Sequence, residues 1–579
     1  MIYRVIGLIG WQNYCEVVNI VSLRKLVDSD HEWIFRACQD LEIQRFTLIP
    51  RPYTREHAIE FLRTQSGEYS VWVIQSGDDP VGVISIHKID ESTGTASVGY
   101  WIAKWGRGQR AASHALTLLC EYARNISEIH TLTAQIATTN VASRATAERS
   151  GFKSAIDIAK TCPDGDTQVV ALLYSKQINS VHKWPTGFMW GTGASSTQCE
   201  GAAPQSDWLA WERAGNAPKS ENGNGFATRY AQDFEILARL GLTHHRLSIE
   251  WARIEPQQGV RDQNAIDHYR KILTAARESN IKIWVCLHHF SLPNWFAKLG
   301  GFLVEENRSK YWLEHVDFVA ETFGDLVTGW QPVNETNYYA TAAYLARGWP
   351  PGHNNVEEWL TVSEQIQLAT AEAAVRLKQT GKLVVSIFGL STLELLDAEP
   401  ATQKFAERFY DANWNTGIKL FRDGVLQIGE RKQVLRPDLA GSFDMIGFSY
   451  YSAHGVRNGK IVAYPETKKI SPLGYAIWPD GLDLVLNRLK KELPNTPLLV
   501  AEFGVGTADD DERSKYLIAG LDVVHSAINR GIDIRGFFHW TAVDNYEWLH
   551  GYDLQFGIIN RDRTTKPSSE VLRQEAKPS

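Results

Sequence analysis

Eight short β-rich runs, separated by stretches with helical periodicity, constrain the fold of this chain more than any other feature of its sequence. Strands of a parallel sheet are buried on both faces and therefore read as short, nearly continuous apolar runs. Eight such runs that alternate with helices predict an α/β fold, a parallel (β/α)8 TIM barrel. The runs cover residues 188–196, 244–251, 282–289, 329–335, 384–392, 445–452, 498–504 and 536–541.

Two of these runs carry a carboxylate at or near their end. The fourth closes with Trp-Gln-Pro-Val-Asn-Glu at Glu335, and the seventh, Leu-Leu-Val-Ala-Glu-Phe-Gly, carries Glu502. Either acid alone is better explained by a capped or salt-bridged strand end. Because the active sites of TIM barrels lie at the carboxyl ends of the strands, the two acids together suggest a catalytic pair.

The chain has 579 residues, which is long for one ordinary domain. Residues 176–183 are polar and without periodicity, and the turn signal Trp184-Pro185-Thr186-Gly187 follows them. We therefore expect a first domain at 1–178, a linker at 179–183 and the barrel at 184–579. The first domain has an α+β pattern, with helices predicted at 30–40, 55–64, 111–125 and 142–149 and strands at 71–75, 81–88, 95–102, 132–136 and 169–175.

The composition argues against several kinds of partner. A formal net charge of −7 does not favour nucleic acid or an anionic membrane surface, so a small neutral substrate fits better. The six cysteines lie far apart without a CxxC pair, which argues against a zinc site and a dense disulfide framework. The first twenty residues lack the pattern of a signal peptide, and no stretch predicts a membrane span. We therefore expect a cytoplasmic protein with free thiols.

Several short motifs in the first domain occur together in a specific order. They are Val98-Gly99-Tyr100-Trp101-Ile102-Ala103, Gly106-Arg107-Gly108-Gln109, Ala115-Leu116, Asn140-Val141-Ala142-Ser143-Arg144 and Ser150-Gly151-Phe152. Over about residues 20–176 they resemble the GNAT acetyltransferases, particularly the branch that acetylates protein N-termini. The resemblance implies a loop that cradles the pyrophosphate of acetyl-CoA at a helix N-terminus. It assigns as cofactor-facing positions Arg107, Gly108, Gln109, Arg110, Ala112 and Asn140.

One of these positions departs from the GNAT pattern. Arg110 stands where that family usually has glycine, whose backbone approaches phosphate closely and adopts strained angles. No residue of this domain is assigned as a general base.

The second domain also carries motifs in a fixed order. They are Gly191-Thr192-Gly193-Ala194, Gln198-Cys199-Glu200-Gly201, Arg246-Leu247-Ser248-Ile249-Glu250-Trp251, His289-Phe290-Ser291-Leu292-Pro293, Asn334-Glu335, Trp540, Asp544-Asn545-Tyr546-Glu547-Trp548 and Phe556-Gly557. From Phe188 to about Glu570 the chain resembles glycoside hydrolase family 1, the retaining β-glucosidases and β-galactosidases. The 11% of aromatic residues agrees with a sugar site, because aromatic faces stack on sugar rings.

The resemblance to family 1 implies a catalytic site. Retaining hydrolysis needs a carboxylic acid and a carboxylate about 5–5.5 Å apart, and the resemblance assigns Glu335 as general acid and base and Glu502 as nucleophile. It places Arg246 beside Glu502, where a cation keeps a carboxylate ionised, and lets Tyr451 hydrogen-bond to it. The positions implied to bind the sugar are Gln198, His289, Asn334, Trp540, Glu547 and Trp548. The resemblance implies neither a metal nor a cofactor for hydrolysis. The pair His288-His289 could suggest a metal site, but it lacks a third ligand at suitable spacing.

Four positions depart from the family 1 pattern. Thr336 replaces the proline after the acid and Phe503 the asparagine after the nucleophile, and we expect both to alter packing rather than chemistry. Phe290 replaces a tryptophan and Ser449 an asparagine. Both are expected at or near the glycone pocket, so the preferred sugar can differ from glucose or galactose.

We therefore predict a retaining β-glycosidase for small soluble β-glycosides, fused to an acetyl-CoA-dependent N-acetyltransferase-like domain. The alternative is an acetyltransferase whose barrel is a carbohydrate-binding pseudoenzyme. The sequence leaves the sugar, the aglycone, the acetyl acceptor and the oligomeric state open.

Overall fold

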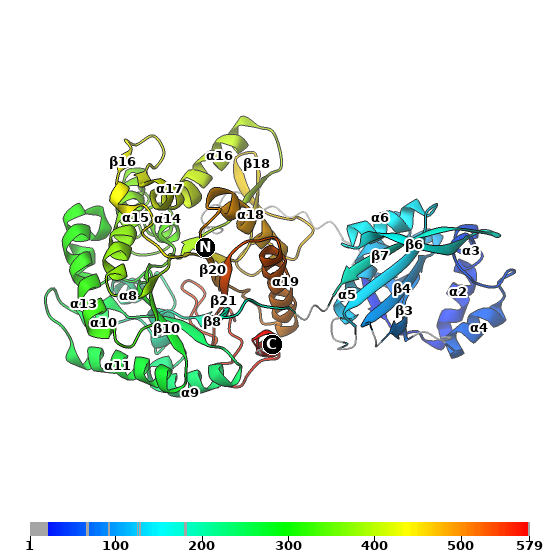
Figure 1. Ribbon diagram of the computed structural model, residues 1–579, viewed down its shortest axis with the longest axis horizontal. Helices are drawn as coiled ribbons and strands as arrows, with labels where there is room; N and C mark the ends of the chain where they lie inside the picture. The colour runs from blue at the N-terminus through cyan, green and yellow to red at the C-terminus, as the bar shows by residue number, and fades with distance from the viewer. Residues whose placement is uncertain are drawn as a thin grey trace. The chain divides into compact units, whose positions relative to one another are not determined.

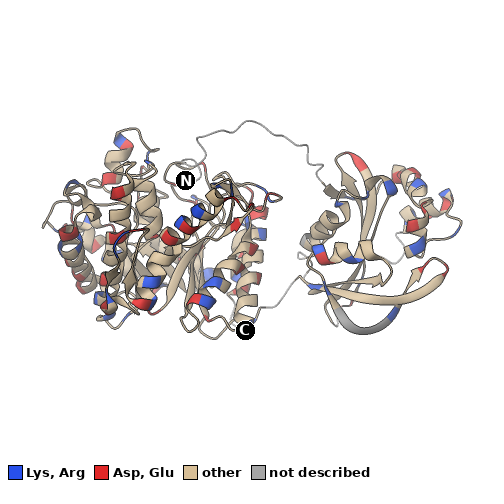
Figure 2. Cartoon of the chain, turned by 90° about the horizontal axis from the view of Figure 1, so that it is seen from above, with Lys and Arg blue, Asp and Glu red and all other residues tan. Residues whose placement is uncertain are grey.

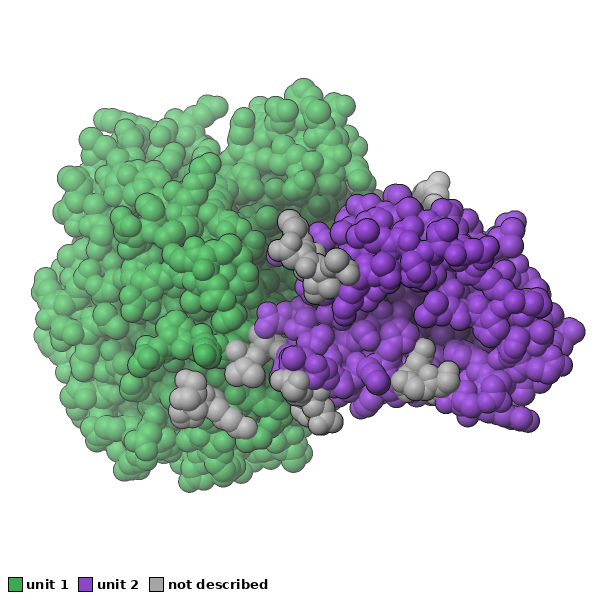
Figure 3. Space-filling view, turned by 45° about the vertical axis from the view of Figure 1, so that its right-hand side comes forward, with its two compact units in different colours: residues 1–11, 182–579 green, residues 12–181 purple. Residues whose placement is uncertain are grey.

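The structure, a computed structural model, describes residues 21–64, 69–90, 93–123, 126, 129–178 and 182–576. These residues form two compact units, one ending before residue 179 and one starting at residue 182 (Figure 3). The first three residues of the expected linker at 179–183 lie outside the described residues. Each unit has its own hydrophobic core, as expected of domains that pack independently.

The second unit is built on a parallel barrel (Figure 1). Its strands are buried along almost their whole length, which explains the continuous apolar runs in the sequence. The sheet order is β12, β11, β10, β9, β8, β21, β20, β17, β13, and the predicted (β/α)8 fold is confirmed. The strands are β8 (Met189–Gly193), β9 (His244–Ser248), β10 (Lys282–His288), β11 (Gly329–Val333), β12 (Leu383–Val384), β13 (Phe388–Gly389), β17 (Ile446–Tyr450), β20 (Leu498–Phe503) and β21 (Ile534–Trp540).

The fifth strand of the barrel is interrupted. β12 pairs with β11 and β13 pairs with β17, so the barrel closes through residues 383–389, which we term the seam. Two isolated bridges, Asn334 to Ile387 and Val385 to Met445, join the middle of the seam to both neighbours. The sequence predicted a single strand at 384–392. The structure divides it because the backbone pairs with β11 at residues 383–384 and with β17 at residues 388–389.

Amphipathic helices surround the barrel. In α11 (Gln263–Glu278), the Asp262 side chain caps the helix by accepting from the N–H groups of Asn264 and Ala265 at 2.8 and 3.2 Å. Its buried residues recur at spacings of three and four, which gives the helix one face for the core. The other main helices are α9 (Phe226–Arg239), α13 (Leu313–Phe323), α15 (Val356–Lys378), α17 (Thr416–Asp423), α18 (Leu482–Glu492), α19 (Asp510–Asn529) and α20 (Ser568–Glu575).

Shorter elements fill the loops between barrel strands and helices. They include α7 (Ser196–Glu200), α8 (Asp207–Arg213), α10 (Trp251–Ile254), α12 (Asn294–Lys298), α14 (Thr336–Tyr344) and α16 (Pro400–Tyr410). A small sheet of β14 (Leu393–Leu395), β18 (His454–Arg457) and β19 (Lys460–Ala463) follows the seam, and β15 (Val425–Leu426) pairs with β16 (Val434–Leu435). Long loops of this kind are where TIM barrels build their active sites.

The first unit contains a seven-stranded sheet in the order β1, β2, β3, β4, β5, β7, β6, antiparallel except for the β4–β5 pair. Its strands are β1 (Val21–Arg24), β2 (Ser70–Ser76), β3 (Asp79–Asp90), β4 (Thr95–Ile102), β5 (Thr131–Ala137), β6 (Lys153–Asp164) and β7 (Thr167–Gln177). Its helices are α2 (His31–Ala37), α3 (Leu41–Phe46), α4 (Arg55–Thr64), α5 (Ala111–Ala123) and α6 (Val141–Arg149). Residues 124–125 of the predicted helix at 111–125 lie outside the described residues.

Three elements of this unit were not predicted from the sequence: β1, α3 and β6. β1 has four residues and α3 has six, too few for a clear periodic signal. β6 is the last strand of the sheet and contains Pro163, which is tolerated at a sheet edge but weakens a strand prediction.

Charged residues of both signs are interspersed on the helices of both units, whereas the central strands carry few of them (Figure 2). This view therefore presents no basic stripe of the kind that binds nucleic acid. In the described part of the chain, no helix combines the length and apolar character needed to cross a bilayer.

Candidate active site

The two predicted catalytic acids lie at the carboxyl ends of their strands and are buried, Glu502 in β20 and Glu335 two residues after β11. Glu335 is the residue before α14 and has φ 43° and ψ 61°. This left-handed conformation costs a residue with a side chain roughly 1–2 kcal/mol. Its backbone N–H donates to the carbonyl of Ile387 at 2.8 Å, so the seam holds the acid in this conformation.

Arg246 joins the surroundings of the two acids. Its guanidinium, on β9, is fully buried. One of its amino groups pairs with the carboxylate of Glu502, and the other donates to Oδ1 of Asn334 at 2.7 Å. Burial lowers the pKa of Arg246, but the charge and hydrogen bond of Glu502, together with Cys286 and Tyr451, outweigh burial and raise the pKa. The hydroxyl of Tyr451 donates to the second oxygen of Glu502 at 2.5 Å, so a cation and a hydrogen-bond donor both favour a carboxylate at this position.

Glu335 has the opposite environment. Burial, with the nearby charges of Glu502 and Glu547, raises the pKa of Glu335 to about 8, although the Ser449 hydroxyl and Arg246 lower it. Glu335 therefore holds its proton at pH 7. A protonated acid beside a paired carboxylate is the division of roles that retaining glycosidases require.

Polar residues predicted to bind the sugar lie around this pair. Gln198, on α7, donates to the carboxyl of Glu547 at 3.1 Å and accepts from the hydroxyl of Ser195 at 2.8 Å. Burial raises the pKa of Glu547 to about 8, and the charge of Glu502 also contributes. A site built from such buried polar groups selects ligands with hydroxyls in matching positions, since unpaired buried groups are costly.

Aromatic rings form another wall of the site. The ring of His289 stacks on those of Trp540 and Trp548 at centroid distances of 5.8 and 6.1 Å, with interplanar angles of 12° and 11°. Nε2 of His289 also lies 3.5 Å from the amide nitrogen of Asn334. Burial lowers the pKa of His289 well below its ordinary value, so this ring is neutral. Direct contacts and charge interactions thus bring together all ten barrel residues that the sequence analysis singled out.

The four departures from the family pattern fall into two groups. Thr336 accepts a hydrogen bond from Gln367 at 2.6 Å, and the ring of Phe503 stacks on Tyr516 at 4.5 Å, so both residues serve packing. Phe290 has φ 71° and its ring contacts Trp548 at 5.4 Å, next to the aromatic wall. Ser449 is in register with Glu502 across the β17–β20 pair and lies beside Glu335.

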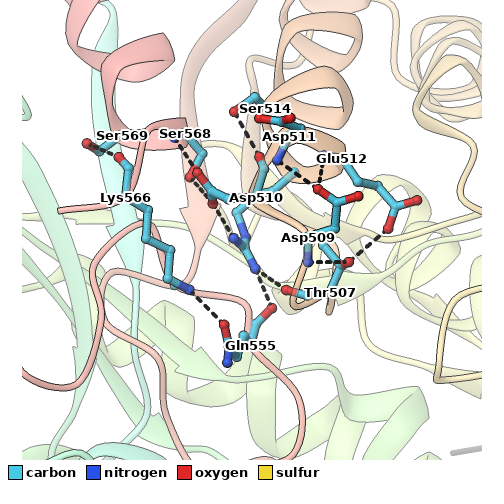
Figure 4. A network of polar contacts seen from close by, with 12 residues as sticks. Thr507, Asp509, Asp510, Asp511, Glu512, Ser514, Gln555, Lys566, Ser568 and Ser569 are labelled. Carbon is cyan, nitrogen blue, oxygen red and sulfur yellow. Dashed lines mark hydrogen bonds and ion pairs between the residues drawn. The ribbon is translucent and has the colours of Figure 1, made fainter. Parts of the chain in front are cut away.

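A network of polar contacts surrounds the segment after the nucleophile strand (Figure 4). Arg513, on α19, is fully buried and donates to the carbonyls of Thr507 and Gln555, the latter at 2.8 Å. The segment that Arg513 holds begins at Gly504, where a Cβ would lie 2.1 Å from the carbonyl oxygen of Trp540. Only glycine permits this approach, which sets the spacing between the nucleophile strand and the stacking tryptophan.

A pocket opens beside Glu335 on the side of the seam, and we term it the seam pocket. Its lining includes Glu335, Tyr338, Leu390, Phe409, Ser449 and Ile461. Tyr338 was missed in the sequence analysis. Its pKa is raised by burial and by Glu335, which it follows by three residues in the first turn of α14, so the helical spacing from the acid was an available signal.

The residues predicted to face acetyl-CoA lie in the first unit, at the start of α5 and of α6. Residues 107–110 are exposed and precede α5, which has 13 residues. Gly108 and Arg110 have φ values of 79° and 57°. Arg110 thus adopts the left-handed conformation that a glycine would favour, and the shape of the loop does not depend on glycine at this position.

The side chains of this loop suit an anion. Arg107 pairs with Asp40 at 2.8 Å, and the Asp40 side chain is half-buried. Asn140 caps α6 by accepting from the N–H of Ser143 at 3.0 Å. An exposed loop with two arginines at a helix N-terminus fits the pyrophosphate of acetyl-CoA.

Comparisons with known proteins agree with this geometry. The family model described as Glycosyl hydrolase family 1 matches residues 180–577, and the one described as Acetyltransferase (GNAT) domain matches residues 21–153. Beta-glucosidase A of Thermotoga maritima is 27% identical over 430 residues, which cover 67% of this chain and 95% of the relative. Beta-galactosidase of Saccharolobus solfataricus is 27% identical over 476 residues, 68% of this chain and 95% of the relative.

Solved structures show the same similarity. A beta-glycosidase from Pyrococcus horikoshii superimposes with a TM-score of 0.62 and 28% identity, covering 68% of this chain and 95% of that one. Every barrel residue described above lies inside the range matched by the first family model.

Proposed function

This chain belongs to glycosyl hydrolase family 1, and on that premise we propose that its barrel is a retaining β-glycosidase in which Glu335 is the acid and base and Glu502 the nucleophile. The observation that carries the assignment is the contrast between the two acids. Arg246 and Tyr451 bind the carboxylate of Glu502, whereas burial and the charge of Glu502 keep the proton on Glu335.

The reaction proceeds by double displacement. In the first step the carboxylate of Glu502 attacks the anomeric carbon, the glycosidic bond breaks, and Glu335 gives its proton to the leaving oxygen. In the second step Glu335 takes a proton from water, the water oxygen attacks the anomeric carbon, and the bond to Glu502 breaks. Two inversions give net retention, and no metal or organic cofactor enters either step.

The sugar lies between the aromatic wall and the polar residues. Gln198 and Glu547 receive hydroxyls on one side, and Trp540 provides a flat surface next to His289. Asn334 is held by Arg246 at 2.7 Å and would face the hydroxyl beside the anomeric centre. The relatives named above are a beta-glucosidase and a beta-galactosidase, so we propose small soluble β-glucosides or β-galactosides as substrates.

Covalent trapping tests the assignment directly. A 2-deoxy-2-fluoro-β-glycosyl fluoride should form a stable adduct on Glu502, located by peptide mass spectrometry. Glu335→Gln and Glu502→Ala should each lower turnover of a chromogenic β-glycoside by orders of magnitude. Glu492→Gln, which removes an acid from a helix ion pair with Arg488 at 2.7 Å, is the matched control. Near-normal rates in either active-site variant would refute the roles.

For the first unit, we propose that acetyl-CoA binds at the start of α5, through the exposed loop and Arg107 and Arg110. Bound acetyl-CoA would supply an activated acetyl group for an amine. The match of residues 21–153 to the GNAT domain supports this proposal, and the loop geometry agrees with it.

Calorimetric titration of the full chain with acetyl-CoA, with CoA as competitor, tests this second proposal. Saturable heat that CoA abolishes is expected, and Arg110→Ala should weaken it. No heat at millimolar acetyl-CoA would refute cofactor binding.

The alternative reading, in which the barrel is a sugar-binding pseudoenzyme, gains no support from the relatives named above. We also propose a cytoplasmic location, because the spacing of the cysteines suits a reducing compartment. Fractionation of cells that produce the full chain would test the location.

A further inference from the structure

We propose that the seam pocket receives the leaving group of the substrate and selects a flat, apolar aglycone. The enzyme would then act on aryl and arylalkyl β-glycosides in preference to β-linked disaccharides. This inference rests on the proposed glycosidase function and adds the substrate class to it.

The position of the pocket relative to the acid is the first argument. A general acid must lie within hydrogen-bond reach of the oxygen that it protonates. Glu335 forms part of the pocket wall, whereas Gln198 and Glu547, proposed to hold the sugar, are not part of that wall. Tyr451, which donates to the nucleophile Glu502, also lines the pocket, so the pocket adjoins both acids and offers space to the group bonded to the oxygen that Glu335 protonates.

Small residues keep this space open. A Cβ at Gly389 would lie 3.1 Å from the ring of Tyr338 and 3.4 Å from Oε1 of Glu335, so even an alanine would press on the Tyr338 ring and touch the acid. Ser449 occupies the position where the resemblance leads one to expect asparagine. Gly389, the last residue of the seam, and Ser449 on β17 are in register with each other across the β13–β17 pair.

The apolar part of the lining suits an aromatic ring. Tyr338, Leu390, Phe409 and Ile461 come from α14, the residue after β13, α16 and β19. Tyr338, Phe409 and Ile461 are half-buried, so their side chains retain surface for a ligand. Rings pack against such side chains with a gain beyond simple burial.

Three polar residues of the pocket, Asn413, Ser391 and Ser452, already have partners within the protein. Asn413 accepts from the amide of Asn337 at 2.7 Å and donates to the carbonyl of Phe409 at 2.9 Å. The hydroxyl of Ser391 donates to the carbonyl of Ser452 at 2.9 Å.

The hydroxyl of Ser452 also has a hydrogen-bond partner, because it donates to the carbonyl of Ala476 at 2.7 Å. A second sugar in this pocket would lose its hydrogen bonds to water and would find these protein groups already hydrogen-bonded. Its buried hydroxyls would then lack partners, which costs free energy. An aromatic group has no such hydroxyls to desolvate.

The test compares leaving groups of similar intrinsic reactivity. Wild-type kcat/KM is measured for a benzyl β-glycoside, a methyl β-glycoside and a β-1,4-linked disaccharide with the same sugar at the cleaved end. All three leaving groups are alcohols, so differences report mainly on binding in the pocket. We expect the benzyl glycoside to exceed the disaccharide by about tenfold or more.

Variants assign the preference to the pocket. Phe409→Ala should lower kcat/KM for the benzyl glycoside about tenfold and leave the methyl glycoside within about twofold. Phe405→Ala is the matched control, because Phe405 lies on the same helix, is also half-buried and packs in the same small cluster, but does not line the pocket. Ile461→Ala repeats the test from β19.

Three results would overturn the inference: a disaccharide cleaved as well as the benzyl glycoside, equal losses for all substrates in Phe409→Ala, or an equal effect of Phe405→Ala. Trapping with a glycosyl fluoride does not need the pocket, because fluoride is a small leaving group. Failure of trapping would therefore refute the glycosidase function itself, and success of trapping with no aryl preference would refute only the inference.

Discussion

The alkaline limb of the pH profile should report the proton on Glu335. Its pKa lies at about 8 because the carboxyl is buried and faces the charge of Glu502. The acid is competent only while protonated, so kcat/KM for a benzyl β-glycoside should be level below pH 8 and fall above it. One pH unit above the pKa about a tenth of the enzyme remains protonated, so the rate at pH 9 should be about tenfold lower.

The assay uses initial rates from pH 6 to 10 and two leaving groups. A benzyl alcohol leaving group needs the proton, whereas a 2,4-dinitrophenolate leaves without it. Glu335→Ala should therefore lose most activity on the benzyl glycoside, retain much of it on the dinitrophenyl glycoside, and show no limb at pH 8. The reasoning fails if the limb persists in Glu335→Ala, or if the wild-type limb lies below pH 6.

The same proton has a consequence for stability. An acid whose pKa is raised from 4.5 to about 8 on folding stabilises the native state fully below pH 4.5, and this contribution is lost as the pH rises through 8. The loss amounts to roughly 5 kcal/mol for one buried group. Glu335→Gln should remove it, so the variant should unfold at higher denaturant concentration than wild type at pH 8.5 and lose this advantage at pH 5. Equal midpoints at pH 8.5 would contradict the burial argument.

Three further outcomes follow. Arg246→Lys keeps a charge beside Glu502 but cannot hold both Glu502 and Asn334, so kcat/KM should fall about 10- to 100-fold; an unchanged value in a folded variant would contradict its role. Burial lowers the pKa of His182, but the ion pairs with Asp522 and Glu575 outweigh burial and raise this pKa to about 9. The two pairs therefore stabilise the barrel by roughly 3 kcal/mol below pH 6.5. This stabilisation is lost as the pH rises through 9. His182→Gln should reduce the difference between the denaturant midpoints at pH 6 and 10, and an unaltered difference would contradict the contribution of His182. Ser449→Ala removes a group that lowers the pKa of Glu335, so the alkaline limb should move to higher pH; a shift to lower pH would contradict the contact.

The barrel could be predicted because its strands are buried on both faces and leave an unmistakable apolar pattern. Residues at strand ends were predictable for the same reason, and so the partners Arg246 and Glu502, 256 positions apart, could be assigned to one site. In the first unit the loop at 107–110 could be located by its glycine and its place before a helix, whereas short or edge elements such as β1, α3 and β6 could not.

The seam pocket was beyond the reach of sequence reasoning. Phe409 and Ile461 lie on α16 and β19, in segments without a catalytic motif, and only the packing of these segments over the seam brings them to Glu335. The pKa of Glu335 was predictable in direction from the paired acid, but its main cause, burial, depends on tertiary packing.

The divided fifth strand has a consequence for how the barrel moves. Two two-residue pairings and two single bridges hold the wall there, compared with five-residue ladders such as the one between β9 and β10. Backbone amides around 385–387 should therefore exchange with deuterium sooner than those of β10, because the wall opens first where it is least connected. The least connected part of the wall would then lie beside the pocket proposed for the leaving group.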